Sequence, residues 1–543
     1  MQEMSGLDAG FLALETPTQH LHVAAVLVFE PPDPARVAQL AARLRSSPRA
    51  PWFTEPRPLH PTRVRDLVEA RLHLVPPFRR KAMRVPLGIG HPVWVEDPDF
   101  DLDDHLHRAC LASPGGPREL AEYVAEIMSR PLDRDRPLWE LHVVEGLEAG
   151  HVALIPKVHH ALVDGVAGAA LLAAFLDVGP EPRDVPPPAS PWVPGPLPSA
   201  GELLGRAVMS LLDRAEEVPD TLRRTAGVLA ELATRHRRLR EEEEREPPPV
   251  PFRAPRTSLN GSISARRRYA FTQVPLEEVR AVRAALGGTV NDVVLAAVSG
   301  ALRRLLAERG EDPDDPLVAL VPLSTRTVPA TAPTDTASAA ARGLPARDLP
   351  TRRRLAAGHV AGHAAGAPGP ADGSSNPLHL GNEVSAMLVS LATPIADPVE
   401  RLHAVARATA LAKQQAAVLD HGLVDAWARL AFPALASRAA RLATSLRIFD
   451  HLAPPFNLVV SNVPGPQFPL WCDGARLVGL YPVGPVVEGA GLNVTVVGYD
   501  GSLCVGALGC RRRVPEVERF GHHLTDAVAE LVKAAARRAG AAP

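Results

Sequence analysis

The chain has 543 residues, more than one hydrophobic core usually organises, so we expect two packed lobes. Hydrophobic residues make up 46% and charged residues 22%, a balance typical of a folded protein. The 59 basic and 61 acidic residues leave a formal charge of −2, which argues against a nucleic-acid partner.

No targeting or spanning signal is evident in the sequence. The first residues lack the basic start and apolar core of a signal peptide, and no run reaches roughly 18 apolar residues. The four cysteines form no Cys-x-x-Cys pair, so reduced thiols are expected. We therefore expect a cytoplasmic protein whose contact with membranes, if it has one, is peripheral.

The amino-terminal part of the chain mixes strands with helices. We predict a first lobe over residues 1–179 and a connector over 180–254, which begins proline-rich and continues as a helix over 202–246 interrupted at Pro219. The predicted elements of the first lobe are strands at 21–29, 141–150 and 152–158 and helices at 36–44, 121–129 and 166–176.

The rest of the chain, 255–543, is predicted as the second lobe. Asp500-Gly501 indicates a tight hairpin turn, and residues 327–376, rich in Ala, Gly and Pro, are predicted to be largely loop. The other predicted elements are helices at 291–308 and 514–538 and strands at 317–323, 383–391, 458–461, 477–483, 492–499 and 502–507. Because strands and helices do not alternate strictly, the pattern favours a layered α/β or α+β fold.

The most informative motif is His159-His160-Ala161-Leu162-Val163-Asp164-Gly165, which lies between a predicted buried strand and a predicted buried helix. Asp164 is placed to cap that helix, and Gly165 allows close passage of the backbone. A neutral imidazole at His160 can take a proton from an alcohol that attacks a thioester. His159 is expected to support the loop. Since the loop contains no Ser or Cys, direct transfer is favoured over a covalent acyl-enzyme.

A metal site is the second functional interpretation of the histidine pair. His142 and His151 are the nearest further histidines along the chain, but neither is convincingly placed as a third ligand. No metal is therefore predicted.

Several segments together resemble the bacterial wax ester synthase/diacylglycerol acyltransferase family, part of the chloramphenicol-acetyltransferase-like, CoA-dependent acyltransferases. The resemblance covers nearly the whole chain, and the motif alone indicates only the superfamily. The supporting segments are 7–11, 100–106, 130–133, Pro137-Leu138-Trp139-Glu140, 291–295, 381–385 and Ser461-Asn462-Val463-Pro464-Gly465-Pro466.

The resemblance implies two lobes of similar fold with a tunnel between them. It implies an enzyme that transfers a long acyl chain from acyl-CoA, as co-substrate and with no cofactor, to diacylglycerol or a long-chain alcohol. The implied catalytic residues are His160, His159, Asp164 and Asn291. The implied substrate-binding residues are Gly165, Pro137, Leu138, Trp139 and Asn462. Helix capping remains the alternative for Asn291, a core role for Pro137-Leu138-Trp139, and a turn for 461–466.

Two other functions remain open. One is acylation of a different hydroxyl or amine, such as a polyketide or glycolipid alcohol. The other is a non-catalytic carrier on lipid droplets. Peripheral contact with a membrane or lipid droplet would use an apolar stripe on the connector helix, formed by Leu203, Leu204, Val208, Leu211 and Leu212, although such a stripe serves equally well for internal packing.

Overall fold

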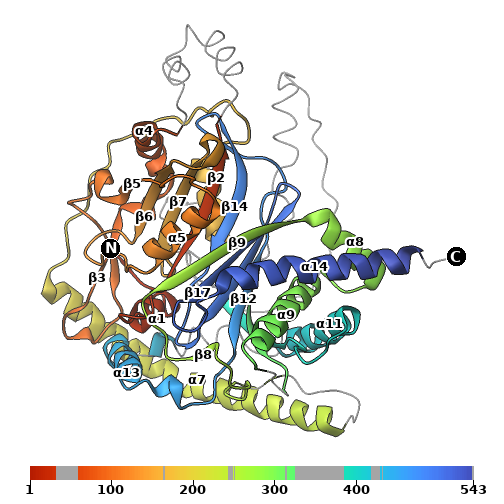
Figure 1. Ribbon diagram of the computed structural model, residues 1–543. Coiled ribbons are helices and arrows are strands. Elements are labelled where there is room, and N and C mark those ends of the chain that lie inside the picture. Colours follow the sequence, from red (N-terminus) through yellow and green to blue (C-terminus); the bar gives the residue numbers. More distant parts are fainter. Residues whose placement is uncertain are drawn as a thin grey trace, which may run out of the picture.

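The computed structural model describes residues 1–31, 59–162, 165–241, 249, 251–311, 315–324, 384–416, 428–430 and 432–540. Two six-stranded sheets form the framework, and helices cover them (Figure 1). This is the layered mixture of strands and helices that the sequence predicts.

The first sheet has helices on both of its faces. Alternate residues of its strands point to opposite faces, so Val144 and Ala153 pack with α5, whereas Val143 and Leu154 belong to the core that includes α4 and α6. The helices are α4 (Pro61–Arg71), α5 (Pro117–Met128) and α6 (Gly165–Phe175). In spatial order the strands are β13 (Trp471–Cys472), β14 (Ala475–Val483), β2 (His22–Glu30), β7 (Val152–His159), β6 (Trp139–Glu145) and β5 (Leu106–Cys110).

The second sheet carries its helices on one face (Figure 1). These helices are α8 (Leu276–Leu286), α9 (Val290–Glu308), α11 (Pro398–Ala416) and α14 (Val517–Gly540), and they enclose the largest apolar core. In spatial order the strands are β11 (Val384–Ser390), β10 (Val318–Ser324), β12 (Leu458–Val463), β16 (Leu492–Tyr499), β17 (Ser502–Cys510) and β9 (Arg267–Pro275).

One strand joins the two halves of the chain. β14 comes from the carboxyl-terminal part of the sequence, yet it pairs antiparallel with β2 in the first sheet. It also contacts β16 and β17 of the second sheet. The predicted boundaries 1–179, 180–254 and 255–543 therefore describe chain order, while the strand pairing crosses between them.

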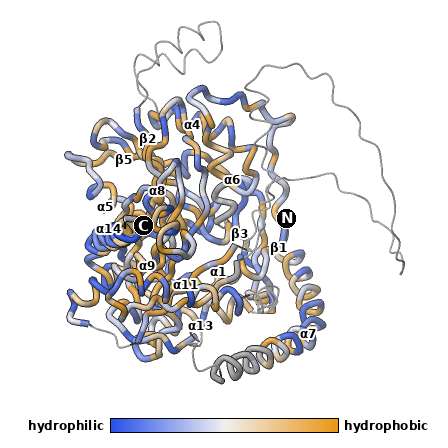
Figure 2. Tube along the Cα trace, turned by 90° about the vertical axis from the view of Figure 1, so that its right-hand side faces the viewer, coloured by the Kyte–Doolittle hydropathy of each residue, from blue (hydrophilic) through white to orange (hydrophobic). Residues whose placement is uncertain are grey.

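Smaller elements surround the sheets. A three-stranded sheet is formed by β1 (Gln2–Glu3), β4 (Val93–Glu96) and β3 (Arg80–Met83), and a two-stranded one by β8 (Asn260–Gly261) and β15 (Gly489–Ala490). Helix α1 (Gly6–Leu14) contacts α13 (Pro433–Ser445). The long helix α7 (Ala200–Glu241) runs along the edge of the molecule (Figures 1 and 2).

The predicted interruption at Pro219 is wrong, because α7 continues through it. Proline removes one backbone hydrogen bond and crowds the preceding turn. Residues 212–213 and 215–220 are exposed, so water can satisfy the carbonyl that Pro219 leaves without its helical partner.

The other predicted elements within the described residues are confirmed, with ends shifted by a few residues. At the hairpin, Asp500 and Gly501 have φ values of 41° and 79°, and Tyr499 pairs with Ser502 across the turn. The sequence did not indicate α1, α4, α8, α11, α13 or β9. The predictions for 36–44 and 327–376 lie outside the described residues.

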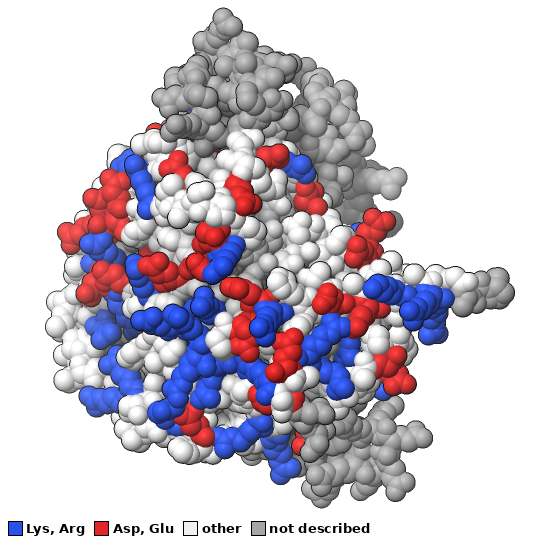
Figure 3. Space-filling model, viewed as in Figure 1, with Lys and Arg blue, Asp and Glu red and all other residues white. Residues whose placement is uncertain are grey.

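The surface carries both signs of charge. Acidic and basic side chains are interspersed on the face shown in Figure 3, in agreement with the small formal charge. Among the described helices, none by itself has the length and apolar character needed to cross a membrane; α8 and α9 meet that test only together, and they are bent by 99° at the break between them.

Candidate active site

The histidine motif forms the turn between β7 and α6, as the sequence predicts. Backbone hydrogen bonds hold this turn to the residues that directly precede the neighbouring strands β6 and β2. The amide of His159 donates to the carbonyl of Leu138 at 3.0 Å, and that of His160 donates to the carbonyl of Leu21 at 2.8 Å. Val163 and Asp164 lie outside the described residues, so the predicted cap by Asp164 remains a prediction.

His159 is buried beneath the turn, with 1% of its surface exposed. Its Nδ1 accepts a hydrogen bond from the amide of Ala161 at 3.0 Å, which places the proton of the neutral ring on Nε2. Burial, reinforced by Arg134 and His160, lowers the pKa of His159 well below its usual value. A neutral, buried ring that bonds the backbone of its own loop supports the turn, as expected.

A buried carboxylate faces this ring. Glu15 Oε1 lies 3.8 Å from His159 Nε2, and because the imidazole is neutral the contact is not an ion pair. Arg134 Nε donates to Glu15 Oε2 at 2.7 Å, and its Nη2 donates to the carbonyl of Leu12 at 2.8 Å. Neither residue was predicted from the sequence, although Arg134 directly follows the segment 130–133 and Glu15 lies four residues beyond the segment 7–11.

His160 is half-buried at the end of β7, and its ring is stacked on a phenyl ring. The centroids of His160 and Phe11 are 4.4 Å apart, with 21° between the planes. Phe11 comes from α1, where a Cβ on Gly6 would lie 2.6 Å from the backbone nitrogen of Arg429. Glycine thus allows α1 to pack closely against the backbone at Arg429, and α1 carries the Phe11 ring that stacks on His160.

Asn291 and Asn462 meet although 171 positions separate them in the chain. Asn462 Nδ2, on β12, donates to Asn291 Oδ1, in the first turn of α9, at 3.3 Å. The helix is capped instead by Thr289 and Asp292, whose side chains bond each other's backbone amides. Thr289 is the N-cap, so the capping alternative for Asn291 is wrong.

Comparison with known proteins identifies the family. Residues 4–294 match the wax ester synthase/diacylglycerol acyltransferase catalytic domain, and residues 380–532 match the carboxyl-terminal domain of the same family. The chain belongs to this family.

Relatives of known sequence or structure agree. The chain is 33% identical over 535 residues to a putative diacylglycerol O-acyltransferase of Mycobacterium tuberculosis, covering 98% of this chain and 90% of the relative. A second putative diacylglycerol O-acyltransferase of that species is 35% identical over 510 residues, covering 93% and 92%. The structure of the wax ester synthase/diacylglycerol acyltransferase from Marinobacter aquaeolei VT8 superposes with a TM-score of 0.59 at 28% identity, covering 98% and 100%. The chain is therefore an acyltransferase.

In this acyltransferase Pro137, Leu138 and Trp139 are buried in the first lobe. The indole of Trp139 is stacked on Phe78 and on His105, with centroids 4.7 and 4.4 Å away, and its Nε1 donates to the carbonyl of Phe78 at 2.8 Å. These contacts are typical of core residues, and a role of the segment in substrate binding stays a prediction. The segment is linked to the motif turn by the carbonyl of Leu138, which accepts the hydrogen bond from the amide of His159.

The far end of α6 in the acyltransferase is fixed by a buried ion pair. Arg71 Nη2 lies 3.0 and 2.9 Å from the two carboxylate oxygens of Asp177, and its Nη1 donates to the carbonyl of Phe175 at 2.6 Å. Since Gly165 opens α6, this anchor and the turn at His159 hold the helix at both ends.

Proposed function

We propose that the chain transfers a long acyl chain from acyl-CoA directly to the hydroxyl of diacylglycerol, with His160 as general base, and that it also accepts long-chain alcohols. The observation that carries this proposal is the environment of His160. His160 is half-buried in the turn that follows β7, and its ring stacks on Phe11, while the neighbouring His159 is fully buried.

The environment of His160 supports the following acyl-transfer reaction. The imidazole of His160 takes the proton of the acceptor hydroxyl as its oxygen attacks the thioester carbonyl. The tetrahedral intermediate collapses with cleavage of the carbon–sulfur bond, and the imidazolium returns the proton to the CoA sulfur. The ester and free CoA leave, and the base is regenerated without an acyl-enzyme.

The asparagine pair supplies polar contacts from the second lobe. Because Asn291 Oδ1 accepts from Asn462, the Nδ2 of Asn291 remains a donor with a set orientation. In the proposed function this donor orients the acceptor hydroxyl or stabilises the oxyanion that forms on the thioester carbonyl. A tunnel that brings the two substrates to His160 from opposite sides is part of the proposal.

We also propose peripheral contact of the protein with a membrane or lipid droplet on the cytoplasmic side. On α7, Leu203 is buried but Val208 and Leu212 are 49% and 58% exposed, so only part of the predicted stripe is used for packing. On α13, Leu435 and Leu442 are 61% and 57% exposed. Both helices contact the turn 86–88, so α7 and α13 lie near each other, and we propose that their exposed apolar side chains act together.

The test of the reaction is release of free CoA from palmitoyl-CoA with dioleoylglycerol, hexadecanol or no acceptor. Release that requires an acceptor supports the proposal, and the better acceptor names the preferred alcohol. If the folded protein releases no CoA with either of these acceptors, and a different hydroxyl or amine restores the release of CoA, the other-acceptor alternative is favoured. Acyl binding without any turnover would favour the carrier.

The membrane contact is tested by flotation of the protein with liposomes that contain dioleoylglycerol. Leu435→Glu with Leu442→Glu should reduce the floated fraction. A change at an exposed position of the first lobe, Glu122→Gln on α5, should leave the floated fraction unchanged. Equal flotation of all three proteins would contradict the contact.

A further inference from the structure

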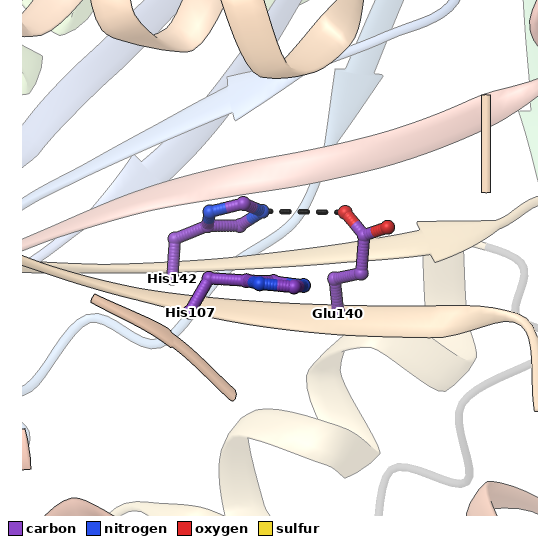
Figure 4. A group of neighbouring side chains, drawn as sticks. All are labelled: His107, Glu140 and His142. Carbon is purple, nitrogen blue, oxygen red and sulfur yellow. Dashed lines mark hydrogen bonds and ion pairs between the residues drawn. The ribbon is translucent and has the colours of Figure 1, made fainter. Parts of the chain in front are cut away.

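Three side chains with metal-binding atoms converge on the α5 side of the first sheet, away from the histidine motif. His107 on β5 and Glu140 and His142 on β6 each offer one nitrogen or oxygen, and these atoms all lie within 4.8 Å of one another (Figure 4). His107 and His142 are paired residues in the parallel β5–β6 register, and their ring centroids are 4.7 Å apart. The register therefore supplies the further ligands that the sequence did not reveal for His142.

One of the three distances between the ligand atoms matches the distance expected around a bound ion. In a tetrahedral site with bonds of about 2.1 Å, ligand atoms lie about 3.4 Å apart. His142 Nε2 and Glu140 Oε2 are already 3.3 Å apart. The third ligand, His107, is half-buried on the edge strand β5, so a rotation of its side chain is enough to complete the set.

A second hydrogen bond orients His142. The hydroxyl of Tyr123, on α5, lies 2.9 Å from His142 Nδ1. When Nδ1–H donates to this hydroxyl, Nε2 presents a lone pair to the space shared with Glu140. Metal-binding histidines are held in this way by a partner on the other ring nitrogen.

Lys157 is the competitor for this site. Its Nζ donates to the carbonyl of Arg130 at 2.9 Å and to Glu140 Oε2 at 3.2 Å. The carboxylate of Glu140 thus already has one cationic partner, and a bound metal ion must share this carboxylate with Lys157. The affinity should therefore be lower than that of a closed structural site with four protein ligands.

We propose that His107, Glu140 and His142 bind one divalent transition-metal ion of zinc-like preference, with water in the fourth position. Two imidazoles and one carboxylate are a ligand set that suits Zn²⁺ and disfavours Mg²⁺ and Ca²⁺. A bound ion would fasten the edge strand β5 to β6. This site is independent of the proposed acyl transfer, since none of its ligands belongs to the motif turn.

The test is a titration of the chelator-treated full-length protein with Zn²⁺, and with Co²⁺ for its visible spectrum. Wild type should bind one ion and show the strong absorption bands of four-coordinate Co²⁺. His107→Gln and His142→Gln should weaken binding at least ~10-fold. His451→Gln, which changes an exposed histidine elsewhere, should bind like wild type.

The thermal midpoint gives an independent readout. Zn²⁺ should raise it in wild type and in His451→Gln, and not in His107→Gln, since a ligand that binds only the folded state stabilises it. Because His107 lies half-exposed on an edge strand, this variant should fold even if His142→Gln does not. Binding by His107→Gln as tight as by wild type, or no uptake by wild type, would overturn the proposal.

Discussion

The two histidines of the motif are adjacent in sequence but differ in burial and in the groups that they contact. His159 is fully buried, is neutral and bonds the backbone of its own turn, whereas His160 is half-buried and stacks on the ring of Phe11. Only a ring with access to a substrate can exchange a proton with it. Burial therefore separates the proposed base from the supporting residue.

His160→Ala should lower the rate of acceptor-dependent CoA release by roughly 10²–10⁴-fold, the usual contribution of a general base. The half-buried ring can be removed without opening the core, so the thermal midpoint should stay within a few degrees of wild type. His451→Ala, which changes an exposed histidine outside the site, is the control and should release CoA at the wild-type rate. Activity in His160→Ala near the wild-type level would contradict the proposed mechanism.

Phe11 tests whether stacking positions the base. Phe11→Ala should lower kcat by about 10-fold, because small misplacements of a catalytic group are costly, and should change KM much less. Phe11→Tyr keeps the ring and should restore kcat. An unchanged kcat in Phe11→Ala would show that the stack does not orient His160.

At the scale of elements, local signals and long-range contacts act together at α6. Its apolar sequence predicts the helix, but its placement depends on Arg71 of α4 and on Asp177 just beyond its last residue. The side chains of this pair are only 5% and 3% exposed, so removal of Arg71 takes the two-pronged partner from a buried carboxylate and leaves it the longer contact with Arg183 Nε at 3.6 Å.

Arg71→Met should therefore lower the free energy of unfolding by about 3–5 kcal/mol. The matched control is Arg65→Met on the same helix, whose side chain is 34% exposed and pairs with Asp103 and Glu69. Such surface pairs contribute about 0–1 kcal/mol. Urea unfolding followed by circular dichroism gives both values, and equal losses in the two variants would refute this account.

At the scale of the whole molecule, the interface between the lobes contains buried neutral histidines. Burial, aided by Arg267 and Lys157, lowers the pKa of His20 from 6.5 to about 4. Burial likewise lowers the pKa of His22, whose ring stacks on that of His20 with centroids 5.6 Å apart. Arg267 reaches this region from β9 of the second sheet and donates to the carbonyl of Thr18 at 2.6 Å.

The protein should accordingly lose stability in mild acid. Below pH 6.5 the unfolded chain protonates these histidines while the folded chain does not, so stability is full above pH 6.5 and falls towards pH 4. Each such group contributes about 1.4 kcal/mol per pH unit. Urea unfolding at pH 7.5, 6.0 and 5.0 should show the loss, with a shallower slope for His20→Gln than for His451→Gln. A free energy of unfolding equal at pH 7.5 and 5.0 would contradict it.

Features that depend on neighbouring residues could be predicted from the sequence. Apolar periodicity located α9 and most strands, Asp500-Gly501 located the hairpin, and the motif placed His159 and His160 on a strand–turn–helix unit. These signals are local because hydrogen bonding and backbone conformation within a helix, strand or turn involve residues close in the chain.

Contacts between distant residues could not be predicted in this way and depend on the packing of the folded chain. The fold places β14 beside β2, Asn462 beside Asn291, Glu15 beside His159 and His107 beside His142. It also places Pro137-Leu138-Trp139 in the core, and α7 is continuous at Pro219. The physical reason is that burial and strand register are set by the packing of the whole chain, which no short window of sequence contains.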